Sequence, residues 1–210
     1  MIVLRALTIE DAPAFMRIYS GATVRFTTGK ALTLEEARTM IHTALSRAAE
    51  TPRAQWNWVI LAKGEIIGLV ALRRRSPVMG TISCALHEDS CGRGFGSEAM
   101  KQVIDFAFTA LGLNRVEGMR HPDNTASGLA LAKIGFVRTG TCDYTEDGKV
   151  VRYVTYAVEA CGHESEATRS GGRDRRSSEV ADGYVGVVDD GEVTHHARSG
   201  TVAAGAESGR

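Results

Sequence analysis

The chain has 210 residues, of which 43% are apolar, enough for one domain with a buried core and some additional chain. Its 25 basic and 25 acidic residues give a formal net charge of zero, so the composition does not favour nucleic acid or an anionic membrane as a partner. No apolar run approaches 18 residues and no signal peptide opens the chain, so we expect a soluble, cytoplasmic protein.

The cysteine pattern argues against a metal site. Cys84, Cys91, Cys142 and Cys161 form no C-x-x-C pair, and no histidine lies at the spacing of a zinc ligand. We therefore expect reduced thiols and no bound metal.

The first half of the chain predicts two helices followed by an antiparallel meander. Thr8 and Thr33 each precede acidic residues and are expected to cap helices, the second as a full capping box. Segment 20–30 between them is polar and is expected to be a loop. The predicted strands are 2–4, 56–61, 65–72 and 81–86, with a tight hairpin turn at Lys63 and Gly64. The arginines at 73–75 are expected to form a solvated hairpin end.

The second half predicts alternating helices and strands and then a tail. The expected elements are a helix from Ser97 to about Leu113, a strand at 114–120, a helix at 126–134, a strand beginning at 136 and a strand at 150–158. From Cys161 to Arg210 there is no Leu, Ile, Phe, Met, Trp or Pro, so this segment cannot form a core. We expect one domain over 1–159 and a disordered tail over 160–210.

A glycine-rich stretch joins the strand at 81–86 to the following helix. It reads C-G-R-G-F-G-S-E-A over 91–99, and such a loop presents backbone N–H groups and the positive end of a helix dipole to an anion. A Walker loop is excluded because Ser97 and Glu98 stand where Lys and Ser/Thr are needed. A dinucleotide site remains an alternative, since Gly94, Gly96 and Ala99 fit G-x-G-x-x-A.

This stretch resembles the acyl-CoA loop of the GNAT superfamily of N-acyltransferases, and within it the branch of ribosomal-protein N-terminal acetyltransferases (RimJ/RimL-like). Cys91 departs from the Trp, Arg or Gln usual at the first position. A second family signature, N-x-x-S followed by K-x-x-G-F, is matched by 124–127 and 133–136. The resemblance covers about residues 1–158.

The resemblance implies an α+β fold of three layers, in which about four helices flank a mixed, mostly antiparallel sheet of six to seven strands. Strands four and five would splay apart and admit the pantetheine arm of acetyl-CoA. The residues implied in cofactor binding are Cys84, Ala85, Leu86, Cys91, Gly92, Arg93, Gly94, Phe95, Gly96, Ser97, Asn124 and Ser127.

The activity implied is acetyl transfer to a primary amine, either a protein N-terminal α-amine or a small-molecule amine, by a monomer or homodimer. Candidate general bases are Glu117, Asp143 and Glu146, of which we assign Glu117 the catalytic role. Leu131 stands where the family often has a proton-donating Tyr, so we assign proton donation to Ser127. A non-catalytic acyl-CoA-binding sensor on the same fold, and less plausibly a dinucleotide-binding protein, are the alternatives.

Overall fold

A computed structural model describes residues 1–146 and 148–160. Apart from Ala160, the tail expected at 160–210 lies outside the described residues. The strands are β1 (Val3–Ala6), β2 (Gln55–Ala62), β3 (Glu65–Arg74), β4 (Met79–Leu86), β5 (Arg115–Arg120), β6 (Val137–Glu146) and β7 (Lys149–Glu159). The α-helices are α1 (Ala12–Ile18), α2 (Leu34–Ala49), α3 (Phe95–Thr109) and α4 (Thr125–Lys133). Three 3₁₀ helices are η1 (Ile9–Asp11), η2 (Gly21–Phe26) and η3 (Glu88–Ser90).

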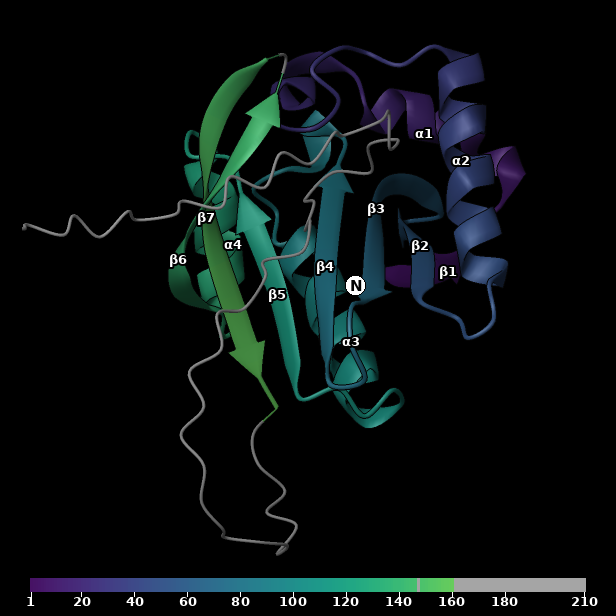
Figure 1. Ribbon diagram of the computed structural model, residues 1–210. Coiled ribbons are helices and arrows are strands. Elements are labelled where there is room, and N and C mark those ends of the chain that lie inside the picture. Colours follow the sequence, from purple (N-terminus) through teal and green to yellow (C-terminus); the bar gives the residue numbers. More distant parts are fainter. Residues whose placement is uncertain (147, 161–210) are drawn as a thin grey trace, which may run out of the picture.

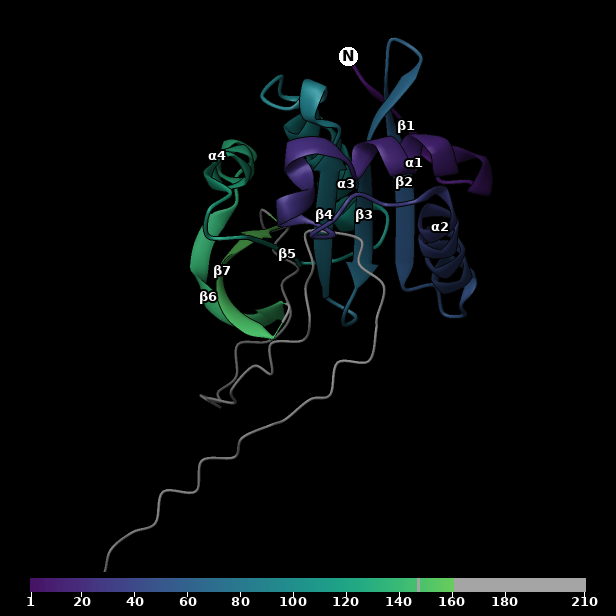
Figure 2. The same ribbon diagram turned by 90° about the horizontal axis from the view of Figure 1, so that it is seen from above.

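The described strands form one seven-stranded sheet in the order β1-β2-β3-β4-β5-β7-β6 (Figure 1). All neighbours pair antiparallel except β4 and β5, which are parallel. Figure 2 shows α2 beside β2 at one end of the sheet and α4 at the other. The predicted α+β architecture is confirmed. A dinucleotide fold has a parallel sheet, so this topology gives the dinucleotide alternative no support.

Parallel pairing of β4 with β5 is short. It joins Met79 to Arg115, Gly80 to Val116 and Thr81 to Glu117, and then stops although β4 continues to Leu86. Beyond that point β5 remains paired with β7 as far as Arg120. The two strands diverge toward their carboxyl ends in Figure 1, as the predicted splay requires.

Alternating side chains of the sheet build a separate core on each face. On β3, Val70 and Leu72 join the cluster under α3, while Leu69 joins the cluster under α1 and α2. Val59 and Ile60 on β2 divide in the same way, as the period of two requires. The helices therefore define an α1/α2 face and an α3/α4 face of the sheet.

Short sequence motifs correctly predicted the start of α2 and the turn between β2 and β3. Thr33 and Glu36 form the predicted capping box, with the Glu36 N–H donating to Thr33 Oγ1 at 3.2 Å and the Thr33 N–H donating to Glu36 Oε2 at 2.8 Å. Lys63 (φ +53°) and Gly64 (φ +82°) make the predicted tight turn between β2 and β3. Here the residue types themselves specify the backbone.

The expected bounds of α3 were wrong at both ends. The helix begins at Phe95 rather than Ser97, because Gly94 takes a left-handed conformation (φ +83°) and serves as its N-cap. It ends at Thr109, and the chain then leaves through Gly112 (φ +66°), whereas the apolar pattern continues to Leu113. Leu113 is nevertheless buried, because it packs in the core from outside the helix.

Segment 20–30 and the three arginines also differ from expectation. The segment contains η2, so it is not only a loop. Arg73 donates to Gln55 Oε1, Arg74 to the Leu111 carbonyl and Arg75 to Thr81 Oγ1, at 3.0 to 3.2 Å. All three are only partly exposed. Arg73 and Arg74 tie the β3–β4 hairpin to β2 and to the chain after α3, and Arg75 bonds within the hairpin, so they do not form a freely solvated end.

An ion pair ties β1 to the start of the helical layer. Arg5 places Nη2 2.7 Å from Asp11 Oδ1, and the Thr8 N–H donates to Asp11 Oδ2 at 2.8 Å. The Asp11 side chain is 6% exposed. Burial acts to raise the pKa of Asp11, but the hydrogen bonds from Arg5 and Thr8 outweigh it and hold the pKa below its usual value.

We expect Asp11→Asn to lower the free energy of unfolding at pH 7 by about 2 kcal/mol, because a buried charged hydrogen-bond acceptor is lost. A depressed carboxyl pKa stabilises the folded state above the unfolded pKa of about 3.9, and this contribution is lost as pH falls through the lower folded pKa. The difference between wild type and variant should therefore shrink toward pH 3. Urea unfolding at both pH values measures it.

Asp143→Asn is the matched control, because Asp143 pairs with Arg152 on the exposed β6–β7 surface. Exposed ion pairs contribute little to stability, so this substitution should be close to neutral. Equal destabilisation by the two substitutions would contradict the role given to burial at Asp11.

Candidate active site

The unpaired half of β4, the loop after it and the start of α3 form one end of the candidate site. The other end is the carboxyl end of β5 and the start of α4. The predicted site residues on β4, on the glycine loop and on α4 thus border one gap between β4 and β5 (Figure 1). The fold brings together segments some forty residues apart.

Backbone geometry at the loop suits an anion. Gly92 (φ +73°) and Gly94 (φ +83°) both take left-handed conformations that glycine adopts without strain. No side chain caps α3, so within the described residues the N–H groups of its first turn are left to solvent or a ligand. The helix dipole favours negative charge at the same place.

Lys133, at the end of α4, is the site residue that sequence reasoning missed. Its Nζ lies 3.9 Å from the position that a Cβ on Gly94 would occupy. This puts an ammonium group beside the N-terminus of α3. The only signal in the sequence was the K of K-x-x-G-F, which by itself reads as the last turn of a helix.

Gly96 and Ser97 have packing roles in the structure. A Cβ on Gly96 would lie 3.4 Å from Leu86 Cδ1 and 3.6 Å from Cys84 Sγ, so it would point at β4 and not at the anion site. The Ser97 hydroxyl donates to the Ala130 carbonyl at 3.3 Å and is nearly buried. These two residues fix how closely α3 approaches β4 and α4.

The remaining loop side chains lie at the surface. Arg93 places its guanidinium carbon 4.9 Å from the centre of the Phe95 ring. Cys91 is exposed, with Sγ 3.6 Å from the His87 carbonyl oxygen. Partial desolvation and the Glu88 carboxylate raise the pKa of the Cys91 thiol. This thiol is therefore a poor nucleophile at neutral pH.

On β4, Cys84, Ala85 and Leu86 lie beyond the last residue paired with β5. Their edge toward β5 has no strand partner in the described part of the chain, so these backbone groups can bind an extended ligand. Burial raises the pKa of Cys84 to about 12, so its thiol stays protonated. Neither thiol at the gap is suited to form a covalent acyl intermediate.

Asn124 and Ser127 divide their roles at the start of α4. The Ser127 N–H donates to Asn124 Oδ1 at 3.1 Å, so Asn124 is the N-cap. The hydroxyl of Ser127 has no hydrogen-bond partner within residues 1–146 and 148–160. Leu131 is 2% exposed and packs close to Gly118, so no proton donor replaces the family's Tyr at that position.

The three candidate general bases differ in their ion-pair partners and in how far the structure describes them. Glu117 Oε1 accepts from Arg115 Nε at 2.7 Å, and Arg115 also bonds to Glu159. Arg152 lowers the pKa of Asp143, which makes Asp143 a weaker base. Glu146 closes β6, and its side chain is outside the described part. Glu117 therefore remains the candidate general base, and its Oε1 already accepts a hydrogen bond from Arg115.

Glu117 and Ser127 lie on opposite faces of the sheet. Glu117 is the register partner of Thr81 and projects from the α1/α2 face. Ser127 belongs to α4, which covers β5 on the α3/α4 face, as the approach of Leu131 to Gly118 shows. The sheet therefore lies between the two side chains, and Glu117 is at the base of the gap, where pairing of β4 with β5 ends.

A strap formed by η2 connects the two ends of the gap. The Ala22 N–H donates to Glu88 Oε2 at 2.7 Å, and a Cβ on Gly21 (φ +67°) would lie 2.3 Å from the same oxygen, so a larger residue would displace the Glu88 carboxylate. At its other end the Phe26 ring lies 5.5 Å from His121, which follows β5. The strap thus links the loop after β4 to the end of β5.

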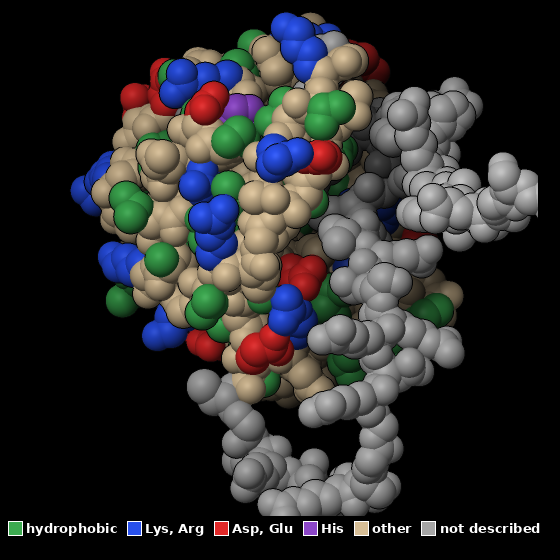
Figure 3. Space-filling view, turned by 60° about the vertical axis from the view of Figure 1, so that its left-hand side comes forward, with side chains coloured by type: hydrophobic (Ala, Val, Ile, Leu, Met, Phe, Trp, Pro, Cys, Tyr) green, Lys and Arg blue, Asp and Glu red, His purple; other side chains and the backbone are tan. Residues whose placement is uncertain are grey.

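Three negative findings apply to the described residues. They contain no group of three or more His, Cys, Asp or Glu side chains arranged to hold a metal ion. None of their helices has the length and hydrophobicity needed to span a bilayer. Basic and acidic side chains are scattered over the surface seen in Figure 3, without a large patch of one sign.

Comparisons with known proteins agree on one family. The family model described as "Acetyltransferase (GNAT) domain" matches residues 2–137. A curated protein of Bacillus licheniformis, "Uncharacterized N-acetyltransferase p20", is 29% identical over 143 residues, which cover 66% of this chain and 80% of that protein.

Solved structures share the fold. RimJ of Mycobacterium smegmatis, in complex with CoA-disulfide, is 24% identical with a TM-score of 0.66, and the matched region covers 76% of this chain and 82% of the RimJ chain. RimL, a ribosomal-protein α-N-acetyltransferase in complex with coenzyme A, is 17% identical with a TM-score of 0.67. The matched region covers 75% of this chain and 93% of the RimL chain. At these identities the likeness shows the fold alone.

We expect Gly96→Val to lower the free energy of unfolding by about 1–3 kcal/mol, because its γ-carbons overpack the contact between α3 and β4. Gly96→Ala is the matched control. Its Cβ fits at ordinary contact distance and lowers the backbone entropy of the unfolded chain, so it should be neutral or stabilising. Denaturant unfolding of both variants measures this difference. If Gly96→Ala destabilised the protein as much as Gly96→Val, the packing role of Gly96 would be contradicted.

Proposed function

Because the chain belongs to the GNAT acetyltransferase family, we propose that it transfers an acetyl group from acetyl-CoA to a primary amine, either a protein N-terminal α-amine or a small-molecule amine. One observation carries the proposal. The start of α3, which has no side-chain cap and has Gly94 and Lys133 beside it, lies next to the stretch of β4 that has no β5 partner.

The residues present fit acetyl-CoA. A Cβ at Gly94 would project into the space beside Lys133 Nζ, so glycine keeps this space open for a phosphate. The backbone N–H groups of the first turn of α3 and the Lys133 ammonium would bind the phosphates, and the free edge of β4 at 84–86 would bind the pantetheine arm. Acetyl-CoA supplies the thioester from which the acetyl group is transferred.

Direct attack by the amine is the proposed reaction type, since both cysteine thiols at the gap stay protonated. A backbone N–H near Leu86 polarises the acetyl carbonyl. The amine must be neutral to attack; an α-amine with a pKa of about 8 is partly neutral at pH 7, whereas a lysine amine near 10.4 is almost wholly charged. Glu117 on the α1/α2 face accepts the amine proton, directly or through water.

Ser127 relays a proton to the departing thiolate: its hydroxyl donates to the sulfur and regains a proton from water. Its hydroxyl is free in the described residues and lies on the α3/α4 face, where α4 approaches α3. The amine and the departing thiolate thus exchange protons with residues on opposite faces of the sheet. This arrangement suits a single displacement, because the two proton transfers do not compete for one side chain.

The test is turnover of acetyl-CoA against a panel of amines, together with calorimetry of acetyl-CoA binding. Binding with turnover supports the proposal, and absence of both contradicts it. Binding without any turnover favours the second candidate, a non-catalytic acyl-CoA sensor, which the buried Leu131 in place of a proton donor supports.

We expect Lys133→Gln to weaken CoA binding by about tenfold, because a charge-assisted contact to phosphate is removed. The salt dependence of binding should also become less steep. Lys101→Gln is the matched control, because Lys101 is exposed on α3 about 9 Å along the helix from its start. Calorimetry at two salt concentrations measures both variants, and equal losses would contradict a specific contact.

We expect Ser127→Ala to lower kcat by up to about 100-fold, the low end for general acid catalysis, with little change in KM for acetyl-CoA. Asn124 caps α4 through the backbone N–H of residue 127, so the melting temperature should not change. Thr125→Ala removes an exposed hydroxyl two residues away and should leave both quantities unchanged. An unchanged kcat in Ser127→Ala would remove its catalytic role.

A further inference from the structure

Arg120 is the last residue of β5, and its side chain lies against the first turn of α4. A Cβ placed on Gly128 would lie only 2.7 Å from Arg120 Nε and 3.0 Å from the Tyr156 hydroxyl oxygen, so glycine at this position leaves the space that these two side chains fill. The guanidinium is therefore next to the turn that carries Ser127. A cation thus lies at the end of the gap where the proposed leaving group departs.

Hydrogen bonds to neutral groups fix the guanidinium in place. Arg120 Nε donates to the Tyr156 hydroxyl at 3.2 Å, and Nη1 donates to the backbone carbonyls of His121 at 3.0 Å and of Pro122 at 2.7 Å. Tyr156 is 8% exposed and belongs to the core under α3 and α4, so its hydroxyl is a rigid acceptor. A guanidinium held in this way needs little reorganisation when negative charge develops beside it.

The charge of Arg120 is not neutralised in the described part of the chain. No carboxylate there forms an ion pair with Arg120, and its Nη2 makes no hydrogen bond there. Asp123, three residues further along, is 80% exposed and pairs with His121. The positive end of the α4 dipole, which lies beside the guanidinium, does not stabilise a cation. A half-buried cation without a counter-ion suits an anion that forms during the reaction.

Arg120 lies on the side of the sheet that we assign to the leaving group. Gly118 packs against α4, and Arg120, two residues further along β5, projects from the same face. Tyr156, the register partner of Gly118 on β7, projects from this face as well. Glu117 projects from the other face, so the sheet lies between the cation and the proposed base. Arg120 therefore shares its face with the proposed proton relay and not with the base.

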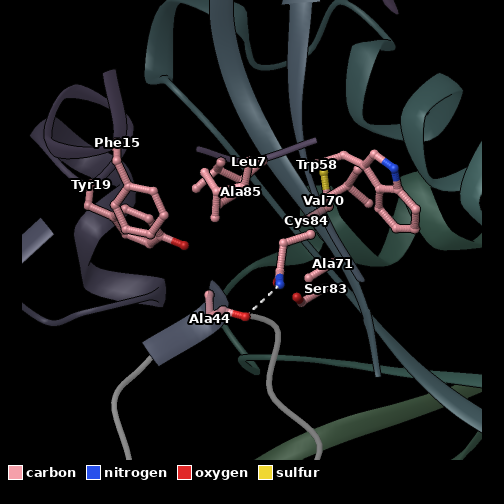
Figure 4. A pocket seen from close by; sticks show the side chains of 12 residues that line it. Leu7, Phe15, Tyr19, Ala44, Trp58, Val70, Ala71, Ser83, Cys84 and Ala85 are labelled. Carbon is pink, nitrogen blue, oxygen red and sulfur yellow. Dashed lines mark hydrogen bonds between the residues drawn. The ribbon is translucent and has the colours of Figure 1, made fainter. Parts of the chain in front are cut away.

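The cavity on the opposite face does not offer a second place for a reacting group. It lies between α1, β3 and β4, and core side chains such as Leu7, Phe15 and Tyr19 line it (Figure 4). Phe15 and Tyr19 are each 1% exposed, and the space that remains holds about one water molecule. The gap between β4 and β5 is therefore where we place the thioester.

We propose that Arg120 stabilises the thiolate of CoA as it leaves the acetyl group, and that Tyr156 positions the guanidinium for this role. When the amine nitrogen has attacked the acetyl carbon, the carbon–sulfur bond breaks and its electron pair goes to sulfur. The guanidinium keeps its own proton and stabilises the sulfur anion by its charge, and Ser127 then relays a proton to the sulfur. The inference rests on the proposed acetyl transfer and adds a catalytic residue to it.

This role explains how the reaction proceeds with Leu131 where a proton-donating Tyr would stand. A free thiol has a pKa of about 8.5, and a cation within about 4–6 Å lowers the pKa of an acidic group by about 1–3 units. A sulfur beside Arg120 therefore leaves as a stable anion near neutral pH. The carbon–sulfur bond can then break before proton transfer to sulfur is complete.

Titration of the thiol of bound CoA tests the inference without turnover. The ultraviolet absorbance of the thiolate should give a thiol pKa at least about one unit lower in the wild-type complex than in the Arg120→Gln complex. Desulfo-CoA, which lacks the thiol, is the matched ligand. Subtracting its titration removes the contribution of the titratable protein groups nearby, which are His121, Asp123, Tyr156 and Cys84. An equal thiol pKa in both complexes overturns the inference and leaves the proposed function standing, whereas absence of CoA binding to the wild type overturns both.

Steady-state kinetics separate the charge of Arg120 from its hydrogen bonds. Arg120→Gln should lower kcat by about tenfold, the rate equivalent of one pKa unit, with little change in KM for acetyl-CoA, because the interaction forms only as the thiolate develops. Arg120→Lys keeps the charge but loses the planar fork of donors, so it should recover most of kcat even where the melting temperature falls. Arg138→Gln, which removes an exposed guanidinium from β6, is the matched control and should change neither kcat nor the thiol pKa.

Tyr156→Phe tests the positioning role. It removes the acceptor of the Arg120 Nε–H, so the thiol pKa of bound CoA should rise part of the way toward its value in Arg120→Gln. In the Arg120→Gln background the same substitution should leave the thiol pKa unchanged, because no guanidinium remains to be positioned.

Three results would contradict the assignment. One is an equal loss of kcat in Arg120→Lys and Arg120→Gln with both melting temperatures lowered, which would show that Arg120 only ties the chain after β5 in place. Another is a loss confined to succinyl-CoA, whose acyl group ends in a carboxylate, with acetyl-CoA unaffected, which would show that Arg120 binds the acyl group. The third is an unchanged thiol pKa in Tyr156→Phe, which would remove the positioning role of Tyr156.

Discussion

The early end of pairing between β4 and β5 is the constraint on which the site depends. Three register pairs hold the strands together, and the remaining half of β4 then has an edge without a strand. Buried backbone N–H and C=O groups require partners, so an edge of this kind inside a sheet is a place for an extended ligand or for water. The neighbouring pairs β3–β4 and β5–β7 continue past this point and keep the two sides of the gap rigid.

The two faces of the sheet give the gap two different sides. On one, α3 and α4 bring the helix start, Lys133 and the free Ser127 hydroxyl to the gap. On the other, Ser83 of β4 and Glu117 of β5 project on the side of the α1/α2 layer. The proposed direct transfer needs the donor and the acceptor to approach one carbon from different directions, and a gap through a sheet is suited to this.

The strap η2 adds a mechanical link between these parts. Glu88 holds its start to the loop after β4, and the contact of Phe26 with His121 holds its end to the chain after β5. Gly21 allows the close approach that the carboxylate requires. The width of the gap is therefore set by contacts across its end as well as by the three register pairs at its base.

Local sequence determined much of this protein: the capping box at Thr33 and Glu36, the turn at Lys63 and Gly64, and the glycine loop before α3 follow from backbone preferences of a few adjacent residues. The two spaced motifs also predicted the family and the splayed sheet. Tertiary structure alone decided that Gly96 packs against Leu86, that Lys133 reaches Gly94, and that Arg120 lies against the first turn of α4. Each of these contacts joins elements separated along the chain, and which face or neighbour a side chain meets is set by sheet register and helix packing, which no local pattern specifies.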